Sequence, residues 1–307
     1  MQFTRRILPV LVSTVLLLGA CATGAPPGRA SGTRLEIVAA EDFWGSIVRQ
    51  LAGDRANVVS IVSNPATDPH DYEATAQDAR RIAAADYVIV NGIGYDGWAQ
   101  KLLAVDSGRT ANARVVLDVG TLVGVKVGGN PHQWYSPSSV EKFVARVAAD
   151  LARLDPADAH YFAQRRDAYE ATGLGAYRDL IAQIRQRYQG TPIGASESIV
   201  TPLAGALGLN MRTPESFLDA VAEGNEPSAR DTAIVNRQIA THEIAVFVYN
   251  LQNATPDVGR LVDAARSRGI PVATVTETLV PAGASFQAWQ ATELRGLRDA
   301  LARAKAA

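Results

Sequence analysis

The sequence predicts an α/β protein with two lobes, and three observations support this. The chain of 307 residues is long enough for two domains of ordinary size. Its composition, with 47% hydrophobic, 20% charged and 7% aromatic residues, is that of a chain that buries a substantial core, which excludes wholesale disorder. From Leu35 onward, short runs rich in β-branched residues alternate with longer amphipathic segments, a pattern typical of βαβ units around a mostly parallel sheet.

The first 20 residues have the pattern of a secretory signal peptide and not of a fold element. Arg5 and Arg6 precede an apolar stretch that is shorter than the roughly 20 apolar residues needed to cross a bilayer. The run Leu-Gly-Ala-Cys then resembles a bacterial lipobox, in which the thiol of Cys21 receives a diacylglyceryl group and the cysteine becomes the mature amino terminus. An ordinary signal peptide with an incidental cysteine is the alternative. Residues 21–33 are rich in Ala, Gly, Pro and Ser, and we expect a flexible tether there.

The first lobe is expected over residues 34–155, as an N-terminal α/β lobe with four strands. Its strands are short apolar runs, and its helices are longer segments whose apolar residues recur at helical spacing. A Gly-rich loop follows at 120–130, and Ser136-Pro137 then signals a helix start, because proline suits the first helical position. The expected strands are 35–39, 56–62, 87–91 and 114–118, and the expected helices are 43–52, 74–84, 95–105 and 140–154.

A long helix is expected to connect the lobes over residues 156–189. Asp155-Pro156 gives the same start signal, and the polar, periodic segment 157–188 contains no proline. Such a segment spans about 45 Å at 1.5 Å per residue, which suits a connector better than a helix packed within one lobe. Gly173 and Gly175 predict a kink, and two shorter helices are the alternative.

The C-terminal α/β lobe is expected over residues 190–307, where the alternation of strands and helices resumes. Two Rossmann-like open α/β lobes of this kind bind ligands in the crevice between them, outside the carboxyl ends of the strands. The expected strands are 191–195, 209–212, 244–250 and 271–275, and the expected helices are 198–207, 214–222, 228–240, 256–267 and 286–304.

Charge and cysteine content exclude several classes of function. With 30 basic and 31 acidic residues the formal net charge is −1, so the chain has no basic field for nucleic acid. Because Cys21 is the single cysteine, the chain can form no internal disulfide, Cys-based zinc site or iron–sulfur cluster. Any metal must therefore be held by histidine and carboxylate side chains.

The four histidines fall into two groups by their sequence surroundings. His70 lies in a turn-rich loop directly after the second expected strand, and His132 follows the Gly-rich loop after the fourth. Both therefore lie at carboxyl ends of strands in one lobe, although a loop histidine satisfied by backbone groups is the alternative for each. His160 and His242 lie on a polar helix and near a helix end, and we interpret both as solvated surface residues.

Two glutamates occupy equivalent positions in the second lobe. Glu197 follows the strand 191–195, and Glu277 follows the strand 271–275. Two carboxylates that face two imidazoles across a cleft would form a four-ligand site that suits zinc, manganese or iron(II). The same residues would also suit a metal-dependent hydrolase, but the chain has no added nucleophile motif or cofactor fingerprint. The carboxylates that could replace either glutamate are Asp71, Glu73, Asp118 and Glu226.

At these residues the chain resembles the zinc/manganese-type substrate-binding proteins of metal-importing ABC transporters, the cluster A-I solute-binding family. The resemblance covers residues 35–304. Pro-His-x-Tyr-Glu at 69–73 and Asn-Pro-His-x-Trp at 130–134 match the family's two amino-terminal histidine motifs. Glu197 matches the third ligand, which is His or Glu in relatives, and Glu277 stands where many relatives carry Asp. The resemblance implies two α/β lobes joined by one long rigid helix, with the ligand in the cleft between the lobes.

The resemblance also implies the function. We expect an extracytoplasmic protein, anchored in the cell envelope by lipid on Cys21, that binds Zn²⁺ or Mn²⁺ as its transported ligand through His70, His132, Glu197 and Glu277. The expected partner is an ABC transporter permease, and we expect a monomer that is not an enzyme and does not bind nucleic acid. Segment 120–130 lacks the His- and acid-rich insertion frequent in dedicated zinc binders of this family. The metal-dependent hydrolase and a surface adhesin remain the alternatives.

Overall fold

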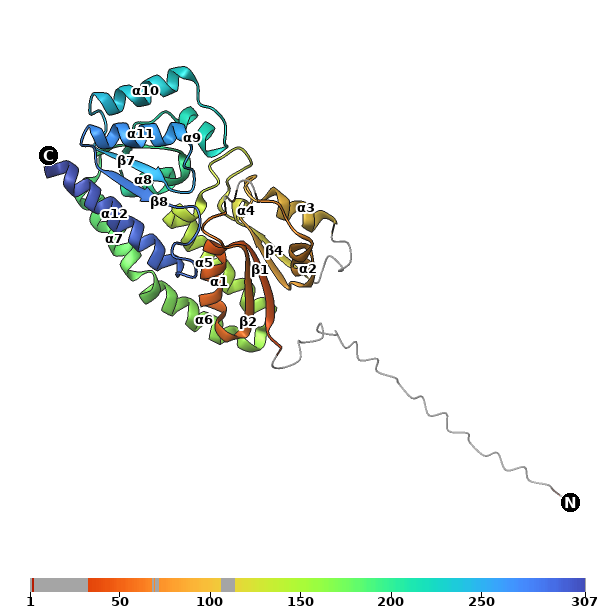
Figure 1. Cartoon of the computed structure of the whole chain (residues 1–307). Helices are drawn as coiled ribbons and strands as arrows, with labels where there is room; N and C mark the ends of the chain where they lie inside the picture. The colour runs from red at the N-terminus through yellow and green to blue at the C-terminus, as the bar shows by residue number, and fades with distance from the viewer. Residues whose placement is uncertain (1, 3–32, 68, 70–71, 106–113, 307) are drawn as a thin grey trace. The chain divides into compact units, whose positions relative to one another are not determined.

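Two four-stranded parallel sheets carry the fold, one in each half of the chain (Figure 1). The computed structural model describes residues 2, 33–67, 69, 72–105 and 114–306. The chain divides into a unit of residues 1–33 and a unit of residues 34–307, and the second unit holds both sheets. Cys21 lies outside the described residues, as do the other residues from 3 to 32.

The first sheet has the strand order β2-β1-β3-β4, and all of its pairings are parallel. Each strand is a short apolar run that lies within two residues of its predicted position, so the hydrophobic pattern was sufficient to locate it. The strands are β1 (Leu35–Glu41), β2 (Ala56–Val62), β3 (Tyr87–Val90) and β4 (Val115–Asp118), and the helices are α1 (Asp42–Ala52), α2 (Ala76–Ala84), α3 (Gly97–Val105), α4 (Val119–Val123) and α5 (Pro137–Leu154).

Local capping sets the ends of two of these helices. Ser136 accepts a hydrogen bond from the backbone N–H of Ser139 and so caps α5, with proline in the first turn as predicted. Helix α4, by contrast, lies within the segment that the sequence predicts as a Gly-rich loop. Asp118 caps α4, and Gly124 ends it in the left-handed conformation at φ 81°. The loop prediction is therefore wrong for residues 120–123.

The segment expected as one connecting helix is helical but interrupted. Helix α6 (Ala159–Ala168) leads into a π-helical turn at Tyr169–Gly173, and α7 (Gly175–Tyr188) continues after Leu174. The interruption lies at the two glycines that predict a kink, where low helix propensity favours a change in hydrogen bonding. Two helices in series, separated by one turn, replace the single helix.

The second sheet repeats the order of the first, as β6-β5-β7-β8, again with parallel pairings only. The prediction of two open α/β lobes is thereby confirmed. The chain order reverses between β5 and β7, the kind of switch point at which open α/β sheets bind ligands. The strands are β5 (Pro192–Ala195), β6 (Asn210–Met211), β7 (Val246–Asn250) and β8 (Val272–Val275), and the helices are α8 (Thr201–Leu207), α9 (Glu215–Ala222), α10 (Ala229–Ala240), α11 (Pro256–Ser267) and α12 (Phe286–Ala306).

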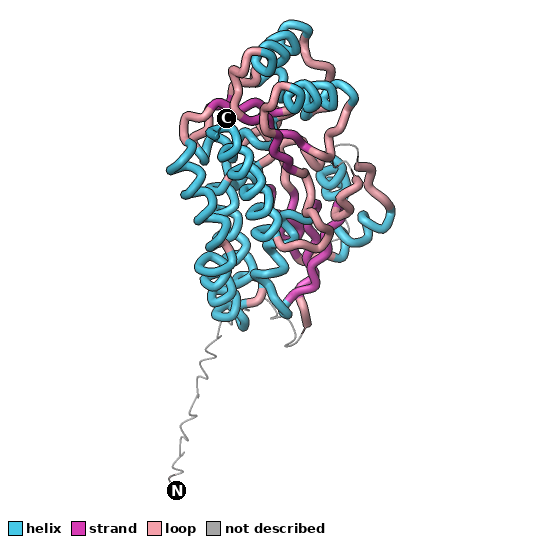
Figure 2. Tube along the Cα trace, turned by 60° about the vertical axis from the view of Figure 1, so that its left-hand side comes forward, coloured by secondary structure: helices cyan, strands magenta, loops and turns pink. Residues whose placement is uncertain are grey.

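Helix α12 packs against elements of both halves of the chain. It lies beside α7, as Figure 1 shows, and also contacts α1 of the first half. Figure 2 shows helices along one flank of the strands. One apolar core includes Ile37 of β1, Val248 of β7 and Leu294 of α12. Although α12 has 21 residues, no helix among the described residues is both long and apolar enough to cross a membrane.

Candidate metal site

One histidine and two glutamates meet in the interior of the second unit. Metal-binding atoms of His132, Glu197 and Glu277 all lie within 4.8 Å of one another. The side chains are almost fully buried, since the residues are 0%, 1% and 3% exposed. The two glutamates each follow a strand of the second sheet by two residues, whereas the histidine lies in the loop before α5. The structure thus brings together three of the four ligands that the sequence predicts.

Asn130 determines how the His132 ring is oriented. Its Oδ1 accepts a hydrogen bond from the backbone N–H of His132 and lies 2.9 Å from Nδ1 of the ring. Because an amide oxygen only accepts, Nδ1 carries a proton and Nε2 is the nitrogen suited to a metal. Nε2 lies 3.6 Å from Oε1 of Glu277, so the ring directs this nitrogen toward the carboxylates.

Aromatic packing fixes the loop that carries His132. Trp134 is fully buried and stacks on Phe43 of α1, with ring centroids 3.9 Å apart. The His132 ring meets Trp134 edge to face, with centroids 5.2 Å apart, and meets Tyr95 in the same way at 6.2 Å. Such pairs add about 0.5–1.5 kcal/mol each beyond burial, so the position of the histidine is built into the core of the first half.

Asn250 links the two glutamates. Its Nδ2 donates one hydrogen bond to Oε1 of Glu197 at 2.8 Å and another to Oε1 of Glu277 at 2.9 Å. Asn250 lies at the end of β7, the strand between β5 and β8, so strand order alone places it between the glutamates that follow those two strands. The amide donors offset part of the repulsion between two carboxylates held close together.

Glu277 is also held from the first half and from α12. The Tyr95 hydroxyl donates to Oε2 of Glu277 at 2.9 Å. Glu293 of α12 accepts a hydrogen bond from the backbone N–H of Thr276 at 2.9 Å, and the Tyr135 hydroxyl donates to the same carboxylate at 2.5 Å. One buried carboxylate of α12 therefore holds both the segment that follows His132 and the segment that precedes Glu277.

Burial and mutual repulsion perturb the titration of the cluster. Burial first, and the neighbouring charge of Glu277 second, raise the pKa of Glu197 to about 8. Burial opposes the protonated form of His132, but the charges of Glu277 and Glu197 outweigh it, and the pKa of His132 is raised. At neutral pH the metal-free cluster therefore retains protons that a bound cation would displace.

We predict that the metal-free protein loses stability as the pH rises from 5 to 8. Burial raises the pKa of Asp96 to about 6, of Asp42 to about 7, and of Glu197 and Glu293 to about 8. These carboxyl groups bind protons more tightly when folded, so their contribution is complete below their unfolded pKa values, near 4, and is lost as the pH passes their folded pKa values. Urea unfolding in the presence of a chelator should show a fall of at least about 2 kcal/mol over this range. A flat or rising profile would contradict the assignment of these groups as buried acids.

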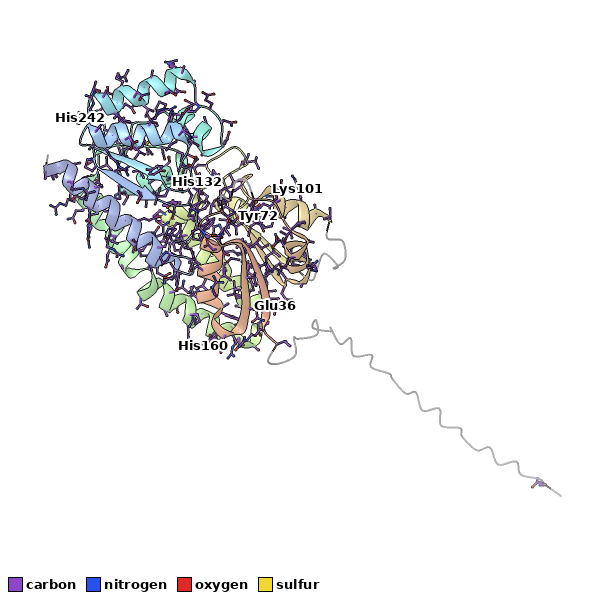
Figure 3. All side chains as sticks on the ribbon, viewed as in Figure 1. Glu36, Tyr72, Lys101, His132, His160 and His242 are labelled. Carbon is purple, nitrogen blue, oxygen red and sulfur yellow. The ribbon has the colours of Figure 1, made fainter. Side chains whose placement is uncertain are left out.

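The other residues singled out by the sequence do not join the cluster within the described part of the chain. His70 and Asp71 lie outside the described residues, whereas their neighbours Pro69 and Tyr72 lie within them. Glu73 and Glu226 are exposed, and Asp118 caps α4. The prediction that His160 and His242 are surface residues is confirmed, since both are exposed and lie at the periphery in Figure 3, while His132 lies inside.

The sequence analysis missed the polar residues that hold the three cluster residues in place. Asn250 ends the strand predicted at 244–250, so the rule that selected Glu197 and Glu277 by strand ends would have found it if applied to the strand between them. Asn130 stands two residues before His132, in the motif already recognised. Tyr95 gives no such signal, because its contact with Glu277 joins residues 182 positions apart.

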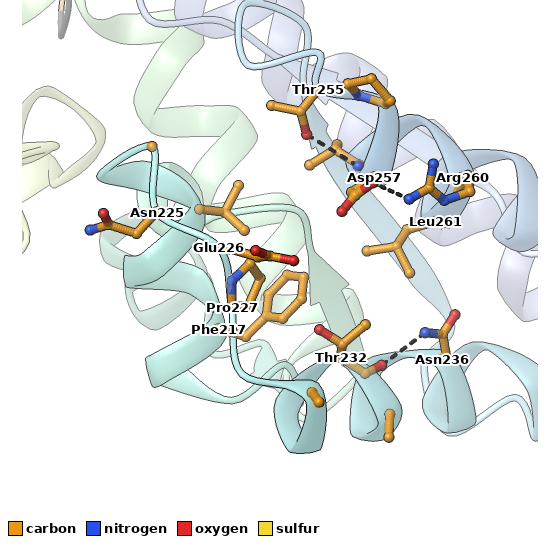
Figure 4. A pocket seen from close by; sticks show the side chains of 16 residues that line it. Phe217, Asn225, Glu226, Pro227, Thr232, Asn236, Thr255, Asp257, Arg260 and Leu261 are labelled. Carbon is orange, nitrogen blue, oxygen red and sulfur yellow. Dashed lines mark hydrogen bonds and ion pairs between the residues drawn. The ribbon is translucent and has the colours of Figure 1, made fainter.

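Cavities near the cluster and away from it differ in their lining residues. A cavity of about 280 Å³ borders it, with Tyr95, Pro131 and Ser198 among its lining residues, each of which contacts or adjoins one of the three cluster residues. A larger cavity of about 820 Å³ lies among α9, α10 and α11 (Figure 4) and contains none of the cluster residues. Of these two cavities, the smaller one is placed to serve the histidine and glutamates.

Comparison with known proteins places the chain in a family. A family model described as zinc-uptake complex component A, periplasmic (ZnuA) matches residues 37–300. The manganese-binding lipoprotein MntA of Halalkalibacterium halodurans is 28% identical over 164 residues, which are 52% of this chain and 53% of that protein. The manganese ABC transporter substrate-binding lipoprotein PsaA of Streptococcus mitis is 30% identical over 171 residues, 52% of this chain and 54% of that protein. The chain thus spans about half the length of the curated relatives it matches.

Solved structures agree on the fold. A manganese-bound periplasmic metal binding protein from Candidatus Liberibacter asiaticus superimposes with a TM-score of 0.70 and 16% identity, covering 86% of this chain and 98% of that one. At this identity the likeness concerns the fold alone. The match of the family model over most of the chain decides the affiliation: the chain belongs to the ZnuA family of periplasmic zinc-uptake components.

Proposed function

We propose that this chain is an extracytoplasmic substrate-binding protein that captures a divalent transition metal, zinc or manganese, and delivers it to the permease of an ABC importer. The observation that carries the proposal is the buried cluster of His132, Glu197 and Glu277. The permease and the direction of transport follow from the family and from the relatives named as ABC transporter substrate-binding lipoproteins. We further propose that the protein acts as a monomer.

The donor set suits a transition metal. One imidazole nitrogen and two carboxylates within 4.8 Å match the ligands of zinc, manganese and iron(II). Oε2 of Glu197 is buried and accepts no hydrogen bond from the described residues, although an unsatisfied buried acceptor costs about 1–3 kcal/mol. A cation bound there would satisfy it. We propose His70 as the fourth ligand, on the strength of its motif alone.

The geometry of the cluster fits a metal-binding protein better than a metal-dependent hydrolase. A catalytic metal site keeps one coordination position open for water or substrate. Here the three side chains are at most 3% exposed, and an asparagine already holds both carboxylates. The arrangement therefore favours a site that encloses its ion and then releases it over one that turns over a substrate.

Metal analysis tests this function. Protein purified without added metal, or stripped and reloaded, is expected to hold one zinc or manganese ion per chain, and competition between the two ions should rank their affinities. Because zinc stands above manganese in the Irving–Williams order, we expect zinc to bind more tightly. A protein that holds neither zinc nor manganese after reloading would contradict the proposal. Turnover of ester or phosphate substrates by the loaded protein would contradict it as well.

We predict that Cys21→Ala moves the protein from the membrane fraction to the soluble fraction. The prediction rests on the Leu-Gly-Ala-Cys run, which resembles a lipobox. Several acyl chains on one cysteine would anchor the protein far more firmly than one chain does. Fractionation of cells that express the wild type and the variant would show the change. Mass spectrometry that finds an unmodified Cys21 in the mature wild-type protein would contradict lipid anchoring.

A further inference from the structure

Asn250 is the residue through which the two glutamates are joined. It is 0% exposed, and both hydrogens of its Nδ2 are used, one on Oε1 of Glu197 and one on Oε1 of Glu277. Its Oδ1 accepts a hydrogen bond from the backbone N–H of Gln252 at 3.0 Å, and its own backbone N–H donates to Ser196 Oγ at 3.1 Å. The amide is thus fixed at both ends and cannot turn over without losing these bonds.

This amide limits what each carboxylate can offer an ion. Oε1 of each glutamate accepts a hydrogen bond from Asn250, and Oε2 of Glu277 accepts one from the Tyr95 hydroxyl. Each carboxylate oxygen has two acceptor sites, so an oxygen that accepts one hydrogen bond still has a site for an ion. Oε2 of Glu197 accepts no hydrogen bond within the described residues. Asn250 holds each carboxylate in the rotation in which the three cluster residues offer one atom each within 4.8 Å of one another. Turning a carboxylate away from this rotation, so that both of its oxygens face one ion, would cost its buried hydrogen bond to Asn250, about 1.5–3 kcal/mol. One oxygen per glutamate is therefore the favoured mode.

We propose that Asn250 sets the metal preference of the site, by holding Glu197 and Glu277 as ligands through one oxygen each. The inference rests on the proposed function. Two single oxygens and Nε2 of His132 give three donors from the described residues, which suits the four-coordinate shell that zinc prefers. Manganese prefers a larger number of oxygen ligands, and a glutamate that binds through both of its oxygens would supply them. Asn250 is in these terms a positioning residue that favours zinc over manganese.

Competitive titration of zinc and manganese with Asn250→Leu tests the proposal. Leucine has the branched shape of asparagine but no donors, so both carboxylates lose the hydrogen bond that fixes their Oε1. We expect the ratio of zinc affinity to manganese affinity to fall at least about tenfold relative to the wild type, which corresponds to about 1.4 kcal/mol. If the ratio of zinc affinity to manganese affinity does not change, the proposal is overturned, even if both affinities fall equally. A residue with a purely structural role would leave the preference between the two metals unchanged.

Cobalt(II) gives a readout that does not depend on affinity. Four-coordinate cobalt absorbs visible light much more strongly than cobalt with five or six ligands, so loaded wild-type protein should absorb strongly and loaded Asn250→Leu weakly. Asn250→Ser retains one donor, and its affinity ratio and absorption should fall between these two. If Asn250→Leu does not fold, Asn250→Ser decides the question, and wild-type values in it would overturn the proposal.

A matched control removes a buried amide elsewhere in the same half of the chain. Gln238 of α10 is 3% exposed and donates to the backbone oxygen of Arg212. Gln238→Met should leave both the affinity ratio and the cobalt spectrum at wild-type values, and an equal shift in this variant would overturn the proposal. Failure of the wild type to bind either metal would instead contradict the proposed function, so the two failures are distinguishable.

Discussion

His132→Ala is expected to lose nearly all of the thermal stabilisation that zinc gives the wild type. Free metal at about a thousand times its dissociation constant adds about 4 kcal/mol to the folded state, which raises Tm by about 10 °C for a chain of this size. Nε2 of His132 faces the carboxylates, and alanine supplies no donor in its place. Scanning calorimetry with zinc and with a chelator would give the difference in Tm for each protein.

Two features make this experiment specific. Because His132 is fully buried against Trp134, the metal-free variant should itself be less stable than the wild type, so the shift caused by zinc is the quantity to compare. His160→Ala is the matched control, since His160 is exposed on α6 and should leave the zinc shift at its wild-type value. Equal shifts in the wild type and His132→Ala would remove His132 from the metal site.

Glu197→Gln is expected to change metal affinity and metal-free stability in opposite directions. Glutamine has nearly the same size but no charge, and its oxygen can still accept from Asn250. Metal affinity should fall at least about a hundredfold, equivalent to about 2.7 kcal/mol, because an anionic ligand is lost. The metal-free protein should become more stable at pH 8 by about 1–3 kcal/mol, since a carboxyl group whose pKa is raised to about 8 no longer has to ionise in the interior.

Isothermal titration and urea unfolding, both at pH 8, measure the two effects separately. The gain in stability should vanish near pH 5, where the wild-type carboxyl group is protonated in the folded state. Glu226→Gln, at an exposed position, should alter neither quantity. Unchanged affinity in Glu197→Gln would exclude it as a ligand, and lower stability at pH 8 would contradict the repulsion inferred between the glutamates.

Most of the fold could be predicted because its signals are local. Apolar runs, proline at helix starts and the alternation of strands and helices located all eight strands and the start of α5. The sequence did not predict α4, because its cap at Asp118 and its end at Gly124 enclose only five residues. The interruption at Tyr169–Gly173 was signalled only as a kink. The lobe limits at 155 and 190 stay a prediction.

The residues of the candidate site that follow strand ends, or that lie in a recognisable motif, could be predicted from the sequence. Glu197 and Glu277 were found because parallel strands of one sheet end at the same edge, and His132 was found from its motif. The contact of Tyr95 with Glu277, and that of Glu293 of α12 with Thr276, could not be predicted, because they depend on how distant segments pack. No local pattern encodes such contacts.

A crystal structure of the protein soaked with zinc, with anomalous scattering recorded at the zinc absorption edge, would locate the bound ion directly. We expect one anomalous peak among His132 Nε2 and the carboxylates of Glu197 and Glu277, at about 2.0–2.2 Å from each ligand atom, with His70 as the fourth ligand. A peak elsewhere in the molecule, or no peak at this cluster in protein saturated with zinc, would contradict it.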